Sequence, residues 1–376
     1  MKAWPKVALG DLFHVEKGRV GIMAATPGDF PLVTTGEKFA SHIEPHFSGD
    51  AVCIPLISAT GHGHASLKRL HHITGDFAIG SILCACVNRE PDRVMGRYAY
   101  YYLDACKDSV LVPLMQGTAN MSMKVADIAG VELPLPPLNE QRVIVARLDA
   151  LAEKAREVEA HLDAVEHDAE HLLALRFRDA IADAPLRPMA EVAPLVRREV
   201  SIDPEKSYTE LGVRSFYKGT FHRRTVPGSD FSWQDLYRVR TGDLVFSNIM
   251  AWEKAIAVAA TDDDGCVGNH RMLTCEARPD TAVPGFLWFY FTTEKGFAKI
   301  YAASPGTAAR NRTMTAPALM AIEVPVPPLE AQQTFDRLQA ATAALKTKHA
   351  AIRHANATLI PATLERIFST EVPAHA

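Results

Sequence analysis

One phrase of eleven residues occurs twice in this chain, and the two copies stand half a chain length apart. The first copy, VELPLPPLNEQ, covers 131–141, and the second, IEVPVPPLEAQ, covers 322–332, which is 191 residues later. In both, a short apolar stretch is followed by Pro-Pro and then by Leu-x-x-Gln at the start of a helical pattern. This period far exceeds the roughly 20 to 50 residues of a solenoid repeat. The sequence therefore predicts a tandem duplication of a domain-sized module, whose function must be needed twice.

The duplication extends upstream of the repeated phrase. Gly-Asp followed by an apolar run stands at 49–52 and again at 242–245, and a short polar loop precedes the phrase at 117–120 and at 306–311. Between these points the two halves are barely alike. A shared frame with diverged contents is expected of two modules that recognise different targets.

The pattern divides the chain into two globules, 1–137 and 185–328, each followed by a helical segment, 138–184 and 329–376. Short apolar and β-branched runs between Gly, Pro and Asp, such as 244–246, predict strands in the globules. The aromatic runs 98–102 and 286–291 fit a buried strand or a buried helix equally well. The predicted fold class is α+β, with two mixed α/β globules in tandem, each followed by a long helix.

The first helical segment has the clearest pattern in the chain. Its apolar positions alternate steps of four and three residues, which is typical of a coiled-coil seam. These positions are Ile144, Leu148, Leu151, Ala155, Val158, Leu162, Val165, Ala169 and Leu172. Asn139 is the predicted N-cap. The segment predicts a helix of roughly 45 residues. A helix well beyond 25 residues is expected to form a coiled coil or a spacer.

The second helical segment has a more polar seam, with Thr342, His349 and Asn356 at core positions. Such residues either select register and partner or leave the helix loosely packed, and both interpretations stay open. The first segment has a net charge of −5 and the second of +1. This difference favours an antiparallel pairing of the two helices.

The composition allows two ordinary cores, because 48% of the 376 residues are apolar. Neither an N-terminal signal sequence nor an apolar stretch of membrane-spanning length is present, and the six cysteines lack the CxxC spacing. These features predict a cytoplasmic protein with reduced core thiols. The formal net charge of −4 argues mildly against non-specific nucleic-acid binding, although basic residues gather locally.

Two local gatherings of basic, histidine and aromatic residues are candidate DNA contacts. The stretch 60–72 is a DNA-facing turn, an ordinary surface loop or, less favoured, a metal site that lacks a completing acidic or Cys ligand. The stretch 212–224 is a DNA-contacting segment or a solvated hairpin, and 34–39 occupies the similar place in the first globule. The predicted DNA-binding residues are Lys38, His62, His64, Lys68, Arg69, Arg214, Tyr217, Lys218, Arg223, Arg224, Arg310 and Arg312.

Signatures of catalysis are missing from the sequence. It has no Asp/Asn-Pro-Pro-aromatic motif of amino-methyltransferases, no Walker loop, no Glu-x-Lys of metal-dependent nucleases and no GxSxG elbow. We therefore predict no catalytic residues, no metal and no cofactor. A hydrolase with a buried catalytic constellation in one globule stays as a further alternative.

The repeated phrase and the two domain openings, VALGDLFHVEKG at 7–18 and PMAEVAPLVRRE at 188–199, resemble the specificity subunit of type I restriction-modification systems. The resemblance covers the whole chain and departs from the usual pattern at Ala331, where Glu is expected. It implies two target-recognition domains in pseudo-two-fold tandem, with the helices paired as an antiparallel coiled-coil spacer. Each domain would recognise one half of a bipartite, asymmetric site in double-stranded DNA.

The resemblance further implies a subunit without catalysis of its own that docks two adenine-methyltransferase subunits, which restriction and translocase subunits can join. S-adenosylmethionine would bind the methyltransferase, not this chain. The implied docking and spacer residues are Pro136, Pro137, Leu138, Gln141, Leu148 and Leu151, with Pro327, Pro328, Leu329, Gln332, Leu338 and Leu345 in the second half. The alternative is a non-catalytic scaffold whose helices recruit partners and whose globules bind protein. Salt-dependent DNA binding would separate the two.

Overall fold

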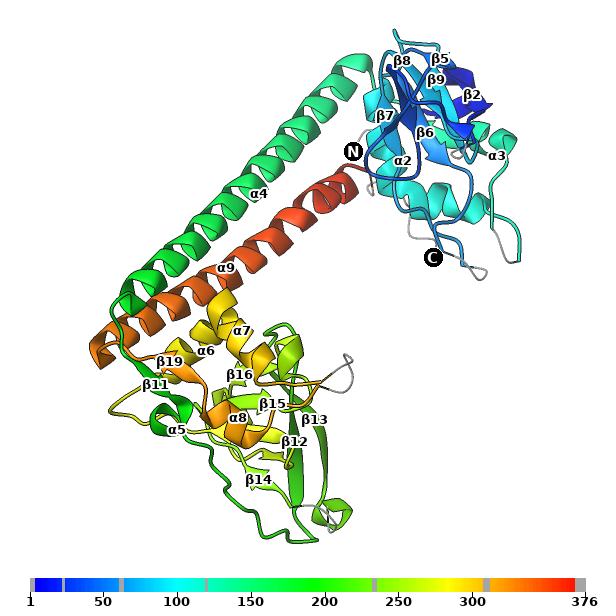
Figure 1. Cartoon of the computed structure of the whole chain (residues 1–376). Coiled ribbons are helices and arrows are strands. Elements are labelled where there is room, and N and C mark those ends of the chain that lie inside the picture. Colours follow the sequence, from blue (N-terminus) through cyan, green and yellow to red (C-terminus); the bar gives the residue numbers. More distant parts are fainter. Residues whose placement is uncertain are drawn as a thin grey trace. The chain divides into compact units, whose positions relative to one another are not determined.

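The computed structural model describes residues 4–21, 24–60, 64–118, 121–231, 235–306 and 312–368. The chain forms two compact units, unit 1 from residues 1–162 and 349–376 and unit 2 from residues 163–348. The division passes through the middle of both long helices, α4 (Leu138–Ile181) and α9 (Leu329–Phe368), which are labelled in Figure 1. Each unit therefore combines one globule with the start of one long helix and the end of the other.

Unit 1 contains two four-stranded sheets. The first has the antiparallel order β2-β9-β6-β7, and the second has the order β4-β3-β8-β5 with β3 and β8 parallel. The strands are β2 (Phe13–Lys17), β3 (Phe30–Val33), β4 (Ala40–His42), β5 (Phe47–Ser48), β6 (Ala51–Pro55), β7 (His71–Ile73), β8 (Asp76–Ile79) and β9 (Leu83–Asn88). Every residue of β6 is buried, which explains why that strand is a continuous apolar run without alternation.

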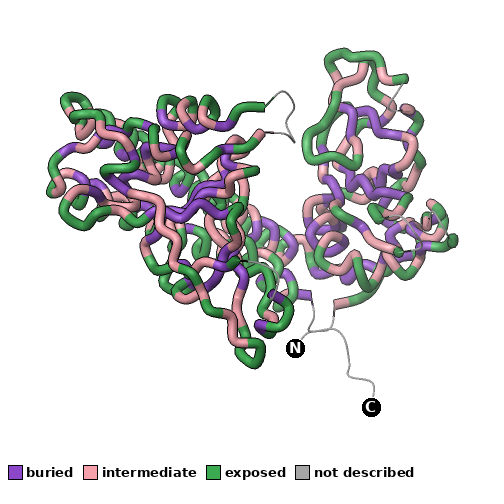
Figure 2. The backbone as a smooth tube through the Cα atoms, turned by 60° about the horizontal axis from the view of Figure 1, so that its bottom comes forward, coloured by how far each residue is buried: buried purple, intermediate pink, exposed green. Residues whose placement is uncertain are grey.

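Helices complete unit 1 on one side of the first sheet. They are α1 (Leu9–Leu12), α2 (Gly96–Val110), the 3-10 turn η2 (Val112–Leu114) and α3 (Val125–Ala129). The aromatic run 98–102 thus lies in a helix, and Tyr98 of α2 is fully buried in the same core as Phe13 and Ile54. The short pair β1 (Lys6–Ala8) and β10 (Glu132–Pro134) leads the chain into α4. In Figure 2 the buried backbone is concentrated in the interior of each unit.

Unit 2 repeats this frame with the same strand order. Its sheets are β13-β12-β17-β14, with β12 and β17 parallel, and β16-β15-β18. An isolated bridge between Leu195 and Cys275 occupies the place of the fourth strand beside β18. The strands are β11 (Leu186–Pro188), β12 (Ser207–Val213), β13 (Thr220–Pro227), β14 (Tyr237–Arg238), β15 (Leu244–Ser247), β16 (Ile256–Val258), β17 (Val267–Gly268), β18 (Met272–Cys275) and β19 (Glu323–Pro325).

The helical parts of unit 2 also follow the order of unit 1. They are α5 (Met189–Val192), η3 (Gly228–Phe231), η4 (Ala251–Glu253), η5 (Thr261–Asp263), α6 (Pro284–Thr292), α7 (Glu294–Ala302) and α8 (Ala316–Met320). The second aromatic run, 286–291, lies in α6. The two Gly-Asp pairs precede β6 and β15, and both glycines, Gly49 (φ +119°) and Gly242 (φ +85°), adopt the left-handed conformation that favours glycine.

The long helices run antiparallel within each unit. In unit 1 the Arg353 guanidinium lies 3.0 Å from Glu159, and the Asn356 side-chain amide donates to the Ala155 carbonyl at 2.9 Å. In unit 2 Lys346 pairs with Glu170. The seam residues Thr342 and His349 are buried. These contacts favour register selection over loose packing for the polar seam.

Two details of the predicted first helix are wrong. The helix begins at Leu138, and the Pro137 carbonyl accepts from the amides of Glu140 and Gln141, so Asn139 lies in the first turn and is not the N-cap. The predicted seam residue Leu172 is 43% exposed, whereas Leu173 is buried. The seam shifts because the end of α4 packs into the core of unit 2 through Leu173 and Phe177.

None of the helices in the described part of the chain is both long and apolar enough to cross a membrane.

Candidate nucleic-acid interface

The loop that joins β12 to β13 in unit 2, residues 214–219, has an unusual backbone. Phe216 (φ +61°) and Tyr217 (φ +57°) both adopt the left-handed conformation, which large side chains rarely take. Their amides donate to the carbonyls of Glu253 and Lys254 at 2.9 Å each. We call this segment loop 2, and the matching segment 34–39 between β3 and β4 of unit 1 is loop 1.

Tyr217 points into unit 2 and anchors loop 2. Its hydroxyl donates to the Phe291 carbonyl at 2.7 Å, and its ring packs edge-on against Trp288, with the centroids 6.2 Å apart. Burial raises the pKa of Tyr217 to about 12. The predicted DNA contact at Tyr217 is therefore replaced by a positioning role, since the hydroxyl is already used inside the unit.

The cationic residues of loop 2 remain on the surface. Arg214 is exposed, stacks 4.9 Å over the Phe221 ring and donates to the Thr220 carbonyl at 2.5 Å. Lys218 is exposed, with its ammonium 6.0 Å from the Phe216 ring centroid. Both cationic side chains are therefore accessible from solvent.

Arg223 and Arg224 of β13 share one carboxylate. Glu210 of β12 is 6% exposed, and its two oxygens lie 3.4 Å from Arg223 and 3.0 Å from Arg224. The register of β12 and β13 shifts directly after Glu210. The Arg223 side chain is nevertheless 64% exposed, so this ion pair orients a guanidinium that remains accessible.

A groove of about 370 Å³ lies beside this pair and contains residues that the sequence did not single out. Its lining includes Arg223, Asn269, Arg271 and Ile249. Arginine and asparagine are the side chains that bind guanine and adenine edges bidentately. The sequence held no signal for Asn269 and Arg271, because their place beside β12 and β13 follows from tertiary structure.

Arg312 is tied into its own unit. Its guanidinium stacks 4.1 Å over the Tyr301 ring and donates to the Ser304 carbonyl at 3.1 Å. The neighbouring predicted contact, Arg310, lies outside the described residues.

Unit 1 brings loop 1 next to the stretch after residue 64. Glu37 of loop 1 lies 3.6 Å from Arg69, while Lys38 and Lys68 are exposed. The exposed His64 accepts hydrogen bonds at its carbonyl from Ser58 (2.6 Å) and Thr60 (3.0 Å). His62 lies outside the described residues. Within the described residues, no group of three or more His, Cys, Asp or Glu side chains could hold a metal ion.

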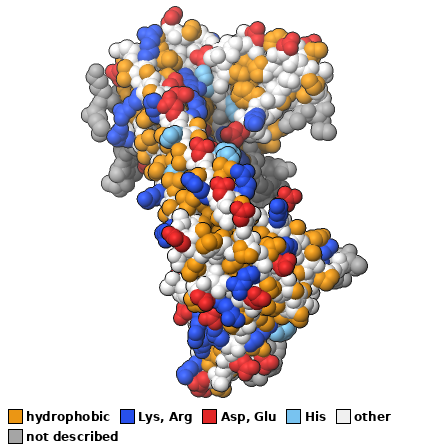
Figure 3. Space-filling view, turned by 60° about the vertical axis from the view of Figure 1, so that its left-hand side comes forward, with side chains coloured by type: hydrophobic (Ala, Val, Ile, Leu, Met, Phe, Trp, Pro, Cys, Tyr) orange, Lys and Arg blue, Asp and Glu red, His pale blue; other side chains and the backbone are white. Residues whose placement is uncertain are grey.

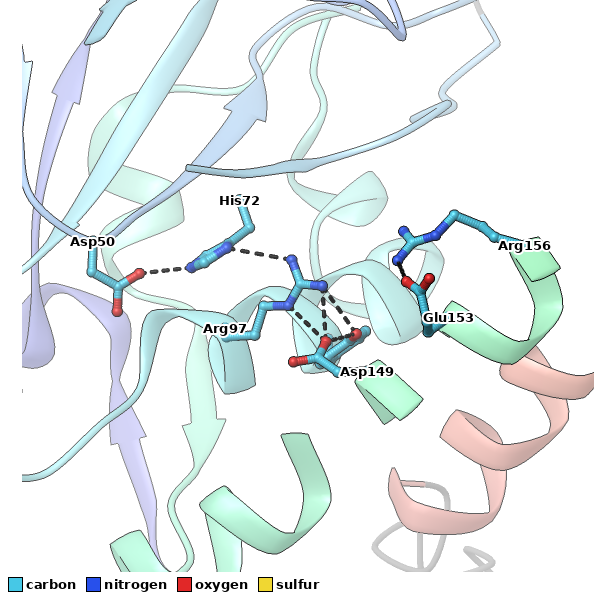
Figure 4. A network of polar contacts seen from close by, with 7 residues as sticks. Asp50, His72, Arg97, Asp149, Glu153 and Arg156 are labelled. Carbon is cyan, nitrogen blue, oxygen red and sulfur yellow. Dashed lines mark hydrogen bonds and ion pairs between the residues drawn. The ribbon is translucent and has the colours of Figure 1, made fainter. Parts of the chain in front are cut away.

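A polar network joins the globule of unit 1 to α4 (Figure 4). His72 contacts Asp50 at 2.7 Å and Arg97 at 3.4 Å, and Arg97 binds Asp149 of α4 at 2.8 Å. Tyr101 donates to the same Asp149 oxygen at 2.5 Å. Burial opposes ionisation of Asp50, but the hydrogen bonds from His72 and the Gly96 amide outweigh it and lower the pKa of Asp50.

The glutamine of the repeated phrase fastens each long helix to its globule. Gln141 accepts from the Met95 amide (2.9 Å) and donates to the carbonyls of Arg93 (2.8 Å) and Pro136 (2.9 Å). Gln332 repeats this pattern with Val283 (3.0 Å), Thr281 (3.0 Å) and Pro327 (2.8 Å).

Both glutamines are fully buried, so the structure gives them a framework role in place of the expected partner contact. Leu148, Pro136 and Pro327 are likewise buried, whereas Pro137 and Pro328 are exposed. The other residues expected to dock partners are intermediate in exposure: Leu138, Leu151, Leu329, Leu338 and Leu345.

An open groove of about 820 Å³ lies beside Pro328 in unit 2. Its lining includes Arg176 of α4, with Glu330, Arg337 and Ala331 of α9. Ala331 is the position at which the repeated phrase departs from the usual Glu. Figure 3 shows charged side chains of both signs interspersed with hydrophobic ones on the face that it presents.

Comparison with known proteins relates the first part of the chain to one family model. Residues 1–167 match the family model of the type I restriction modification DNA specificity domain. No curated protein sequence matches the chain.

Solved structures match over nearly the whole chain. The type I restriction-modification S subunit from M. genitalium has a TM-score of 0.51 at 15% identity, with 95% of each chain covered. The HsdS subunit from Thermoanaerobacter tengcongensis has a TM-score of 0.54 at 18% identity, covering 98% of this chain and 96% of that chain. A chain from a structure of type I R-M complex assembly and conformational transition has a TM-score of 0.60 at 19% identity, with 97% of each chain covered. Residues 1–167 therefore match the type I restriction modification DNA specificity domain, and the chain as a whole has the fold of the S subunits of these systems.

Proposed function

We propose that the chain is the sequence-determining subunit of a type I restriction-modification complex, and that each globule recognises one half of a bipartite, asymmetric DNA site. One observation carries this proposal. Two units with the same strand order present different side chains from the same loop, TTGEKF in loop 1 and RSFYKG in loop 2. Recognition of two different DNA sequences by one repeated frame accounts for the shared strand order and for the different side chains of the two loops.

The contacts to DNA are assigned by chemistry. Lys38, Lys68, Arg214 and Lys218 are exposed cations suited to phosphate oxygens or to guanine edges. The groove with Arg223, Asn269 and Arg271 is suited to base edges in the half-site of unit 2. Glu210 prearranges Arg223, which lowers the entropy lost on binding.

The long helices are proposed to separate the two half-sites and to dock two methyltransferase subunits. The unit 2 groove beside Pro328 offers apolar surface together with Arg176 and Arg337 for one such partner. The adenine chemistry and the S-adenosylmethionine would belong to those partners, and this chain would act without catalysis of its own. In this proposal 1–137 and 185–328 are the recognition domains, and 138–184 and 329–376 are the spacer helices.

The experiment is a binding titration of the full chain, alone and with co-expressed methyltransferase subunits, on a library of duplexes. We expect selection of a bipartite motif and an affinity that falls steeply with salt, because phosphate contacts release counterions. Methyl transfer from labelled S-adenosylmethionine should require the partner. A chain that selects no motif and binds duplex DNA without salt dependence would instead support a protein-binding scaffold.

A further inference from the structure

The side chain of Phe216 is 63% exposed, the most exposed Phe, Tyr or Trp in the described part of the chain. Its neighbour Tyr217 points into unit 2, so the loop separates two adjacent aromatic rings to opposite sides. An apolar ring held in water is unfavourable for a free subunit. The position of the Phe216 ring therefore indicates the kind of ligand that loop 2 contacts.

The backbone enforces this exposure. Phe216 and Tyr217 are consecutive left-handed residues, a strained arrangement that persists only where the surroundings hold it. Here the two amides are bonded to the carbonyls of Glu253 and Lys254, and the Ser215 hydroxyl donates to the Glu253 carboxylate at 3.1 Å. Lys254 is itself left-handed (φ +66°), so two strained turns hold each other.

Cations lie on both sides of the ring in sequence. Lys218 has its ammonium 6.0 Å from the Phe216 ring centroid, and Arg214 is exposed on the other side of it. Loop 1 of unit 1 also carries a partly exposed aromatic, since Phe39 is 40% exposed and follows Lys38, although it stands at the end of the loop and its ring packs edge-on against His71 with the centroids 5.2 Å apart. A rigid apolar ring between cations is the chemistry of a wedge that enters a base stack while its neighbours hold phosphates.

We propose that Phe216 inserts between two base pairs of the half-site that unit 2 recognises and unstacks them. This inference rests on the proposed function and adds the mode of contact and the residue. Pyrimidine–purine steps unstack most easily, so the wedge favours a TA or CA/TG step at its position without any hydrogen bond to a base.

The test uses the full chain, with its methyltransferase partners, on duplexes that carry 2-aminopurine at each position of the unit 2 half-site in turn. We expect fluorescence to rise at one step for the wild type and for Phe216→Trp, which keeps a flat aromatic ring. Phe216→Ala should abolish the rise and weaken specific binding by about 5- to 100-fold, the range for loss of one aromatic–base stack. Leu186→Ala removes a similarly exposed apolar side chain of unit 2 and is the matched control.

The outcomes separate the wedge from DNA recognition itself. Wild-type protein that binds its site without any fluorescence change overturns the wedge but leaves the proposed function intact. The wedge also fails if Phe216→Ala keeps the rise, because the unstacking would then not depend on the Phe216 ring. Protein that binds no DNA overturns both proposals. Because the ring is exposed, Phe216→Ala should keep the thermal stability of the wild type.

Discussion

Loop 1 and loop 2 stand at the same place in the two units but are built differently. Loop 1 is polar and locally hydrogen-bonded, with the Gly36 amide donating to the Thr34 hydroxyl and Glu37 paired to Arg69. Loop 2 is strained, and its aromatic anchor Tyr217 is fixed to α6. The glutamines that fasten the long helices, by contrast, make equivalent hydrogen bonds in both units.

The difference shows which constraints a duplicated frame keeps. Gln141 and Gln332 are themselves buried and bond buried or partly buried backbone groups, and a side chain without an amide would leave those groups without this partner. Apart from the anchor Tyr217, most side chains of loops 1 and 2 are exposed, so they can change at little cost to the fold. The frame therefore stays constant while the contact surface diverges.

The largest loss of stability is expected from replacing Gln141 or Gln332. Gln141→Ala or Gln332→Ala removes the side-chain partner of two carbonyls, one of them buried, and of one amide, which should destabilise that unit by about 3 kcal/mol. Hydrogen exchange of the full chain would show faster exchange at the start of α4 for the first variant and of α9 for the second. The exposed neighbours Arg142→Ala and Gln333→Ala are matched controls. If the glutamine variants kept the hydrogen-exchange protection of the wild type, Gln141 and Gln332 would not have the framework role inferred for them.

Substitutions in loop 1 and in loop 2 should each affect the recognition of a different half-site. Arg214→Ala or Lys218→Ala should weaken recognition of the unit 2 half-site, by about 1–3 kcal/mol if the residue contacts a base. Lys38→Ala should act only on the other half-site. Selection from a duplex library randomised in both halves measures this, and equal relaxation of both halves by one variant would contradict two independent readers.

The helix contacts should differ between the units by a smaller amount. Asn356→Ala removes the hydrogen bond to Ala155 in unit 1 and should cost about 1 kcal/mol. Lys346→Ala breaks the exposed pair with Glu170 in unit 2 and should cost about 0.5 kcal/mol or less, with the loss vanishing in high salt. Urea unfolding at low and high salt compares them. A loss of stability for Lys346→Ala that exceeds the loss for Asn356→Ala and does not depend on salt would contradict this prediction.

The smallest effect concerns pH and should be confined to unit 1. Because the folded-state pKa of Asp50 is lowered, its contribution to stability is present above the unfolded value, and it is lost as the pH falls below about 4 through the folded pKa. Asp50→Asn should therefore flatten the acid dependence of unit 1 stability, measured by hydrogen exchange between pH 3 and 6. Asp92→Asn, at an exposed site of the same unit, is the control. An acid dependence that is unchanged in Asp50→Asn would exclude this carboxylate as its source.

The frame was largely predictable from the sequence, and the surface was not. The repeated phrase and the alternating steps of four and three residues are local patterns, and they predicted both long helices. The family resemblance implied a docking role for Gln141, and the sequence did not show its framework role, since its bonds reach backbone 46 and 48 residues away, which no local pattern reveals. Tyr217 was predicted as a DNA contact from its basic and aromatic neighbours in sequence. Its anchor, the Phe291 carbonyl, lies 74 residues away, so no local pattern showed it.

The division of the two units also bears on the order in which the chain can fold as it is synthesised. Domains usually fold from the N-terminus onward. Unit 2 is one continuous stretch, 163–348, whereas unit 1 needs residues from both ends of the chain. Phe368, near the C-terminus, packs against Tyr98 and Tyr102 in the core of unit 1, with ring centroids 5.9 and 5.3 Å apart. Of the two globules, the one that is synthesised earlier is thus completed later, and loss of the last turns of α9 would damage the unit that contains that earlier globule.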